Sequence, residues 1–111
     1  MPKDEENWNS KAAQIAADEI SKIDSCDVIP PVQMLQILKV LNERRRQDEK
    51  WGGNEHDDAH TTSEWVAIIA GELNEVLWGI AEGDQKQTEE ELVHVAAVAV
   101  AWLEAIERRK G

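Results

Sequence analysis

Residues 61–109 limit the fold of this chain more than any other segment, because their apolar residues recur with the period of an α-helix on both sides of one short break. The break consists of Gly83 and Asp84, which favour a turn and interrupt the helical pattern. Two helices joined by so short a connection pack as an antiparallel hairpin. The sequence therefore predicts a helical hairpin in the C-terminal half of the chain.

Both helices of this hairpin carry a capping pattern near the expected first turn. Thr61 is followed three residues later by Glu64, and Thr88 is followed in the same way by Glu91. This spacing lets the threonine and glutamate side chains bond each other's backbone N–H groups. We expect one helix from Thr61 to about residue 82 and the other from Thr88 to about residue 109. Taken alone, Glu91 is explained by this capping role.

The N-terminal half is also helical in its periodicity, and no stretch alternates over the length of a strand. Helices are expected over residues 8–22 and, because proline suits a first turn, from the Pro30-Pro31 pair to about residue 50. Residues 1–7 are polar and are expected to fray, while residues 24–27 break the first helix. Residues 51–60 lack periodicity and are expected to form a loop.

The helix before this loop has an apolar face that indicates which side it turns to the core. The apolar residues of that face are Met34, Ile37, Leu38 and Leu41. Arg45 and Asp48 continue the same stripe beyond its apolar end. We therefore expect Arg45 and Asp48 at the border between the core and a functional site. Arg44, Arg45 and Arg46 together are most simply a solvated helix end.

Length and composition fit one compact all-α domain spanning residues 1–111, because a chain of this size buries roughly two thirds of its unfolded surface. The sequence has neither a secretory leader nor an apolar run of the roughly 20 residues that a membrane span needs, so we expect a cytoplasmic protein. A net charge of −11 argues against nucleic-acid and anionic-membrane partners. Cys26 is the only cysteine and is expected to be an inert thiol.

Four side chains that can bind a metal occur in pairs three residues apart on the hairpin, Glu72 with Glu75 and Glu91 with His94. This spacing places each pair on one face of its helix. Glu72 falls inside an apolar stripe formed by Trp65, Ile68, Ile69 and Val76. Buried carboxylates need a partner, and no Lys or Arg is spaced to neutralise them within either motif. Their convergence therefore predicts a divalent cation.

These residues also have explanations that need no metal ion. Glu72 and Glu75 can be hydrogen-bonded core carboxylates, although the nearby sequence offers few donors. A single histidine such as His94 is more often a core or rim residue than a ligand. Residues 56–60 include His56, Asp57, Asp58 and His60. Their composition fits a separate metal site, but turns rich in Asp and Asn are common in loops, which favours the plainer interpretation.

The motifs and their flanking residues resemble the all-α MazG-type nucleoside triphosphate pyrophosphohydrolases, especially the short MazG-like proteins of phages and mobile elements. That family has Glu-Glu-x-x-Glu on one helix and Glu-x-x-Asp on the next. Here residues 71–75 read Gly-Glu-Leu-Asn-Glu and residues 91–94 read Glu-Leu-Val-His, so glycine and histidine replace two family carboxylates. Residues 46–52, the His56-Asp57 pair and residues 90–102 also look like the short phage-type members. The resemblance covers about residues 41–109.

The resemblance implies a four-helix MazG-like bundle that forms a homodimer or homotetramer. It also implies Mg²⁺-dependent cleavage of a (d)NTP to (d)NMP and pyrophosphate by attack of water, in nucleotide-pool house-cleaning. Glu72, Glu75 and Glu91 would be the catalytic carboxylates and metal ligands. His94 would be a fourth ligand that favours Mn²⁺, or a residue behind the ligands, because imidazole is a poor ligand for Mg²⁺.

Substrate contacts are predicted from position only. Arg45 and Lys50 are candidates for the phosphates, Trp51 for stacking on the base, and Asp48 for the same side of the site. The sequence does not identify the base or the sugar.

Two other classes of function remain open from the sequence. Glu91-x-x-His94 matches the Glu-x-x-His pattern of ferritin-like di-metal bundles, but such sites use that motif twice. A non-catalytic helical interaction protein is the second alternative. The chain has no Gly-x-x-x-x-Gly-Lys phosphate loop and no nucleophile paired with a base, which leaves kinase-like and covalent mechanisms without support.

Overall fold

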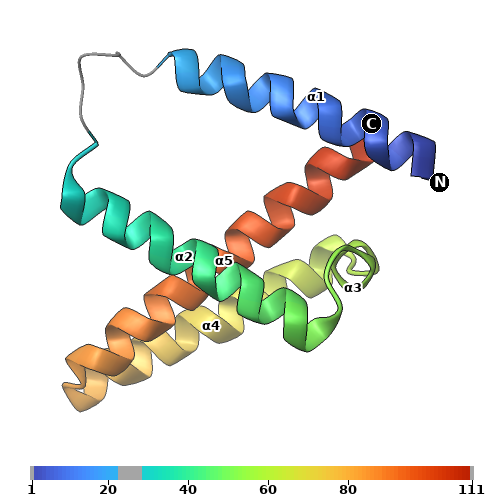
Figure 1. Cartoon of the computed structure of the whole chain (residues 1–111). Coiled ribbons are helices and arrows are strands. Elements are labelled where there is room, and N and C mark those ends of the chain that lie inside the picture. The colour runs from blue at the N-terminus through green and yellow to red at the C-terminus, as the bar shows by residue number, and fades with distance from the viewer. Residues whose placement is uncertain (1, 23–28, 111) are drawn as a thin grey trace.

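The computed structural model is all-helical, as the sequence predicts (Figure 1). It describes residues 2–22 and 29–110, with side chains from Ser10 onward in these ranges. Within them the helices are α1 (Pro2–Ser21), α2 (Pro31–Trp51), α3 (Asn54–Asp58), α4 (Thr62–Glu82) and α5 (Gln85–Lys110), and there is no strand. Four helices were expected from the sequence, and the additional one is α3.

Helices α4 and α5 pack along one another in opposite directions and form the main core (Figure 1). Trp65 near the start of α4 stacks on Trp102 near the end of α5, with ring centroids 6.1 Å apart. At the other end Gly79 lies against Thr88, where a Cβ on Gly79 would come within 2.7 Å of the Thr88 hydroxyl oxygen. The buried residues of this core are Trp65, Val98, Ala101 and Ala105, with Ile68, Ile69 and Trp102 packed against them.

The capping of these two helices agrees with the sequence at one end only. Thr61 and Glu64 form the predicted capping box at the start of α4. At the start of α5, Asp84 rather than Thr88 is the cap, because the Gln87 N–H donates to Asp84 Oδ1 at 3.0 Å. The Thr88 hydroxyl instead donates to the Asp84 carbonyl within the first turn. The helix begins at Gln85, three residues earlier than predicted, because aspartate caps a helix as well as threonine does.

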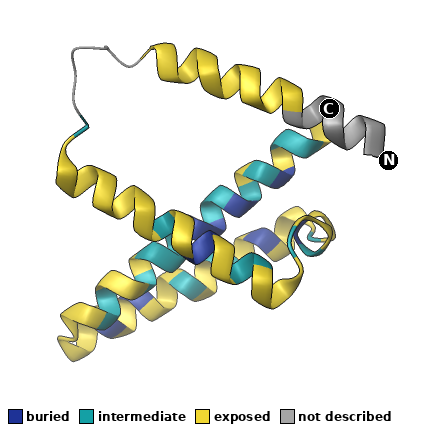
Figure 2. Ribbon diagram, viewed as in Figure 1, coloured by how far each residue is buried: buried dark blue, intermediate teal, exposed yellow. Residues whose placement is uncertain are grey.

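Helix α2 crosses α5 with a polar face turned inward, contrary to the sequence prediction. Glu43 and Arg44 are buried at the crossing, where Arg44 is 5% exposed (Figure 2). Arg44 donates to Asp48 at 2.8 Å and to Glu104 of α5 at 3.1 Å, so the prediction of a solvated helix end is wrong for this arginine. The predicted core face of α2 is exposed: its residues are Met34, Ile37, Leu38 and Leu41.

The predicted loop of residues 51–60 contains α3, which is too short for its periodicity to be seen in the sequence. Gly52 and Gly53 have φ angles of 100° and 69°, and this left-handed backbone turns the chain sharply between α2 and α3. Asp58 then accepts hydrogen bonds from Arg108 of α5 at 2.9 and 3.1 Å. Helix α3 is thereby held beside α5.

Helix α1 begins at Pro2 rather than near residue 8, and proline is favourable at a first helical position. It lies apart from α4 in Figure 1, and Ala12 of α1 lines a shallow cavity together with Leu103 of α5. The predicted break at residues 24–27 and the inert thiol of Cys26 lie outside the described residues. No helix in the described part combines the length and the apolar character needed to cross a membrane.

The described chain is more open than a packed domain of its length. Its radius of gyration is 16.2 Å. A compact domain of this length would have about 13 Å. The difference follows from the separation of α1 and from the uncovered apolar face of α2 (Figure 2).

Candidate functional site

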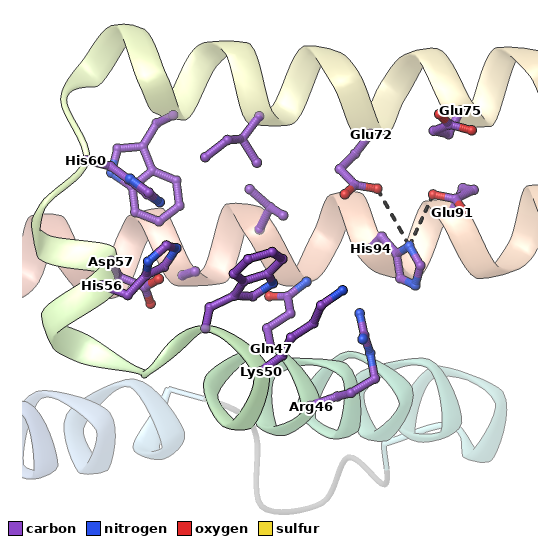
Figure 3. A pocket seen from close by; sticks show the side chains of 15 residues that line it. Arg46, Gln47, Lys50, His56, Asp57, His60, Glu72, Glu75, Glu91 and His94 are labelled. Carbon is purple, nitrogen blue, oxygen red and sulfur yellow. Dashed lines mark hydrogen bonds and ion pairs between the residues drawn. The ribbon is translucent and has the colours of Figure 1, made fainter.

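A cavity of about 570 Å³ lies where α2, α3, α4 and α5 meet (Figure 3). Its walls include four of the residues predicted for the site on α4 and α5, which are Glu72, Glu75, Glu91 and His94. They also include Lys50 and Trp51 from the end of α2. The fold thus brings most of the predicted site residues to one place.

Glu72, Glu91 and His94 form the tightest group in this cavity, which we call the carboxylate end. His94 Nδ1 lies 3.1 Å from Glu91 Oε2 and 3.6 Å from Glu72 Oε2 (Figure 3). One ligand atom from each of the three residues lies within 4.8 Å of the others. All three side chains are partly buried. The antiparallel packing of α4 and α5 produces this convergence, since Glu72 and His94 lie at similar distances along the chain from the turn that joins the two helices.

The charge of the carboxylate end is poorly balanced without a cation. Burial raises the pKa of the Glu72 carboxyl above its ordinary value of 4.5, and the hydrogen bond with Glu91 raises it further. His94 acts in the opposite direction. Loss of hydration and the nearby carboxylates thus oppose ionisation of Glu72 more strongly than His94 favours it.

Glu75 is exposed and belongs to the rim of the cavity rather than to the tight group. It lies one turn along α4 from Glu72, beside Glu91 in Figure 3. The structure therefore separates the four predicted ligands into a close group of three and one residue at the edge.

Two residues of α2 at this site were not predicted from the sequence. Glu43 Oε2 lies 3.6 Å from His94 Nε2, and Arg46 donates to both carboxylate oxygens of Glu43 at 2.8 and 2.6 Å. These bonds lower the pKa of the Glu43 carboxyl below its usual value. His94 is therefore enclosed by carboxylates on both of its nitrogens, with Glu72 and Glu91 on one side and Glu43 on the other.

Arg45 and Asp48, by contrast, do not line the cavity. Arg45 is exposed, and Asp48 is bonded to Arg44. Both were placed by extending the apolar stripe of α2, whereas the helix turns a different face to the site. The residues of that face are Glu43, Arg46, Gln47 and Lys50. Their spacing of three, four and seven residues from Glu43 is a helical face, and this polar stripe is the signal that could have identified them.

The opposite part of the cavity is aromatic and contains a second group of possible ligands. His56, Asp57 and His60 form this group, which we call the imidazole end (Figure 3). Trp51 stacks on His56 with ring centroids 5.7 Å apart, and His60 and Trp65 meet edge to face with ring centroids 4.8 Å apart. Burial raises the pKa of the Asp57 carboxyl, and the charge of Arg44 opposes that rise.

The arrangement joins three kinds of chemistry in one cavity. Hard oxygen donors lie at the carboxylate end, Arg46 and Lys50 supply positive charge from α2, and aromatic rings lie at the other end. Such a cavity fits a ligand that has an anionic part bound through a divalent cation and a flat ring that stacks. Comparison of the chain with known protein families, with curated proteins and with solved structures gave no match.

Proposed function

We propose that this protein is a metal-dependent nucleoside triphosphate pyrophosphohydrolase that releases a nucleoside monophosphate and pyrophosphate by attack of water. The observation that carries the proposal is a single cavity with Glu72, Glu91 and His94 at one end and stacked aromatic rings at the other. The resemblance of residues 41–109 to the MazG-type family supports the same reaction.

The donor set at the carboxylate end fits Mg²⁺. Glu72 and Glu91, with Glu75 at the rim, offer carboxylate oxygens, which are the ligands that this ion prefers. A bound Mg²⁺ would neutralise phosphate charge and lower the pKa of a water molecule. This neutralisation suits a protein with a net charge of −11, which otherwise repels a triphosphate. Mn²⁺ is the second candidate, because His94 brings an imidazole close to the ligands.

The remaining roles in the proposal belong to side chains on α2, α3 and α5. Arg46 and Lys50 lie on the wall between the two ends, where they can pair with phosphate oxygens. Trp51 and His56 form a stacked pair that offers a flat surface to a base. His94 contacts Glu91 and faces Glu43, and we assign it the role of holding the carboxylates in position.

We also propose that the chain forms a MazG-like four-helix bundle with a C-terminal hairpin and assembles as a homodimer or homotetramer. The exposed apolar face of α2 supports an assembly, since a monomer rarely leaves so long an apolar stripe uncovered. Light scattering at micromolar concentration should give at least twice the chain mass of 12.5 kDa. A mass of one chain at that concentration would contradict the assembly.

The test of the reaction is a panel of ribo- and deoxyribonucleoside triphosphates with Mg²⁺ or Mn²⁺, in which pyrophosphate and monophosphate are both measured. We expect the two products in equal amounts. Release of orthophosphate with a diphosphate would show cleavage at a different bond. Absence of turnover with either ion across the panel would instead favour the non-catalytic interaction protein.

A ferritin-like di-metal function is less well supported. The carboxylate end contains one histidine, His94, within the described residues, whereas those sites use two Glu-x-x-His motifs. A metal analysis that finds two iron ions bound per chain would favour the ferritin-like function over the pyrophosphohydrolase.

A further inference from the structure

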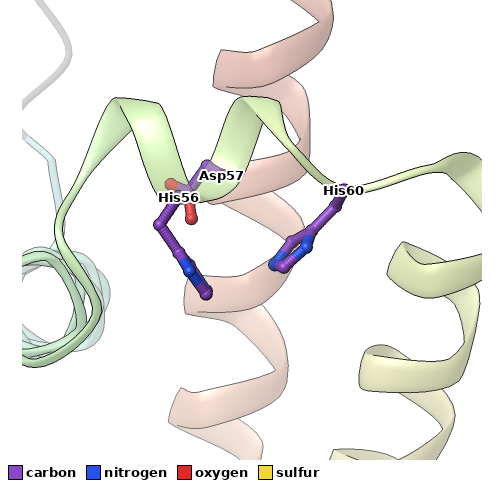
Figure 4. A group of neighbouring side chains, drawn as sticks. All are labelled: His56, Asp57 and His60. Carbon is purple, nitrogen blue, oxygen red and sulfur yellow. The ribbon is translucent and has the colours of Figure 1, made fainter.

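The imidazole end of the cavity contains a second set of metal-competent side chains, separate from the carboxylate end. His56, Asp57 and His60 each offer one ligand atom, and these atoms lie within 4.8 Å of one another (Figure 4). His56 and Asp57 belong to α3, and His60 follows the end of that helix. In Figure 3 they lie on the opposite side of the cavity from His94.

The backbone of this segment holds the two histidines close together. His56 and His60 are four residues apart, and the spacing brings their rings to a centroid distance of 4.7 Å. The His60 N–H donates to the Asp57 carbonyl at 3.2 Å, and the Ala59 N–H donates to the His56 carbonyl at 3.3 Å. The turn that follows α3 is therefore hydrogen-bonded rather than open.

The ring nitrogens of these histidines remain available for a ligand. Trp51 packs on the ring of His56 and Trp65 packs on that of His60, so aromatic contacts position both rings. Among the described residues, neither imidazole has a hydrogen bond or an ion pair. Both side chains are half-buried. A pair of half-buried imidazoles with unused nitrogens beside a carboxylate is the arrangement that metal ions use in proteins.

The carboxylate of Asp57 is also short of positive charge. Its nearest cation is Arg44, whose Nη2 lies 3.4 Å from Asp57 Oδ2. The same guanidinium also pairs with Asp48 at 2.8 Å and with Glu104 at 3.1 Å. The Arg44 guanidinium thus contacts three carboxylates, of which Glu104 also has Arg108 at 3.8 Å, and Asp57 makes the longest of the three contacts with Arg44. A buried carboxylate with this weak compensation gains from a second cation on its other side.

We propose that His56, Asp57 and His60 form a second metal site, which takes a first-row transition ion such as Zn²⁺ rather than Mg²⁺. Two imidazole nitrogens and one carboxylate oxygen are the donors of open zinc and iron sites, whereas Mg²⁺ selects oxygen. Ligand atoms around a tetrahedral ion at 2.0–2.1 Å lie roughly 3.4 Å apart, so small rotations of the side chains close the group. This inference goes beyond the proposed reaction and does not rest on it.

The test uses the metal-free full-length protein without nucleotide and Co²⁺ as the probe. Millimolar Mg²⁺ is present throughout to occupy the carboxylate end. We expect one equivalent of Co²⁺ to give visible absorption bands of a nitrogen-containing site and to quench tryptophan fluorescence, since Trp51 and Trp65 flank the histidines. His56→Gln and His60→Gln should each weaken Co²⁺ binding by at least about tenfold.

The matched control is Glu72→Gln, which alters the carboxylate end and should leave Co²⁺ binding at the imidazole end unchanged. Loss of the bands in Glu72→Gln with retention in His60→Gln would overturn the proposal, and so would the absence of bands from the wild type. Far-ultraviolet circular dichroism checks the fold of each variant, and Asp57→Asn is a further probe if a histidine variant is unfolded. Because nucleotide is absent, failure of the proposed reaction would not affect this result.

Discussion

Helix α5 packs against α4 and α2 in opposite ways. Its contact with α4 is apolar, with Trp65 buried against Val98 and Ala101. Its contact with α2 is ionic, with the buried Arg44 bonded to Glu104. Apolar contact stabilises through burial and tolerates small shifts, whereas a buried ion pair is costly to desolvate and requires one geometry. The ionic contact therefore fixes how α2 is rotated about its axis.

The candidate site lies where these two contacts meet. His94 of α5 reaches Glu72 of α4 on one side and Glu43 of α2 on the other. The rotation of α2 set by Arg44 also turns Arg46 and Lys50 toward the cavity. The α4 contact thus builds the carboxylate end, and the α2 contact supplies its positive charge.

The largest expected effect comes from removing a carboxylate at this junction. Glu72→Gln should lower the rate of pyrophosphate release on the order of a hundredfold or more at saturating Mg²⁺, because it removes an oxygen ligand while keeping the side-chain volume. Glu82→Gln, near the end of the same helix and outside the cavity, is the matched control and should keep the wild-type rate. Near wild-type turnover in Glu72→Gln would show that the ligand assignment is wrong.

Removing the arginine of the ionic contact should cause the largest loss of stability. Arg44→Met leaves Asp57 without its paired cation and leaves Glu104 with only the 3.8 Å contact to Arg108, so it should reduce the free energy of unfolding by about 3–5 kcal/mol. Arg45→Met, at an exposed neighbour on the same turn, should change it by less than about 0.5 kcal/mol. Urea denaturation at one protein concentration measures both values. Equal effects would mean that the ionic contact does not hold α2.

The apolar contact can be tested with two glycines of α4. Gly79→Ala places a Cβ 2.7 Å from Thr88 Oγ1 and 3.1 Å from the Thr88 nitrogen, so α4 and α5 must separate. We expect a net loss of about 1–3 kcal/mol despite the better helix propensity of alanine. Gly71→Ala meets nothing within 4 Å and should gain up to about 1 kcal/mol. A similar change in thermal stability for both variants would contradict the close approach at Gly79.

The α4–α5 contact was predictable from the sequence because its apolar residues repeat with the helical period and Gly83 marks the turn. The capping box at Thr61 was predictable for the same reason, since both members are local. The predicted start of α5 was wrong by three residues because Asp84 and Thr88 are both good N-cap residues, and capping propensity alone does not choose between them.

The inward face of α2 was not predictable in this way. Its most apolar stripe includes Leu38 and Leu41, and the periodicity indicated that this stripe should be buried. The helix is instead rotated by the pairing of Arg44 with Glu104, sixty residues away in the sequence. For this reason Arg45 and Asp48 were predicted at the site while Glu43 and Arg46 were missed. The helical spacing of Glu43, Arg46, Gln47 and Lys50 shows that they share a face, but pairing between distant charges, which turns that face inward, leaves no mark in the periodicity.

A smaller effect is expected in the pH dependence of stability without metal. The folded state raises the pKa of the Glu72 carboxyl above 4.5, so it holds its proton more tightly than the unfolded chain does. The stability from Glu72 is therefore fully present below pH 4.5 and is lost as pH rises through the folded-state pKa. With a chelator present, the free energy of unfolding of the wild type should fall relative to that of Glu72→Gln between pH 4.5 and neutrality. Parallel pH profiles would contradict this assignment.

The smallest expected effect concerns His94, for which the sequence left open a role as a metal ligand or a role behind the ligands. If His94 were a metal ligand, His94→Asp would replace nitrogen with oxygen and shift the ratio of Mn²⁺-supported to Mg²⁺-supported rates strongly toward Mg²⁺. The structure places each ring nitrogen beside a carboxylate instead, with Nδ1 3.1 Å from Glu91 and Nε2 3.6 Å from Glu43. Nδ1 is thus hydrogen-bonded to Glu91 and Nε2 faces Glu43, which favours a positioning role.

For a positioning residue, we expect His94→Asp to change the Mn²⁺ to Mg²⁺ rate ratio by less than about twofold. The same substitution should destabilise the metal-free protein, because it adds a carboxylate among Glu43, Glu72 and Glu91. His94→Gln keeps a hydrogen-bond donor for Glu91 without adding charge, so it should retain more metal-free stability than His94→Asp. A ratio that moves tenfold toward Mg²⁺ in His94→Asp but not in His94→Gln would instead identify His94 as a ligand.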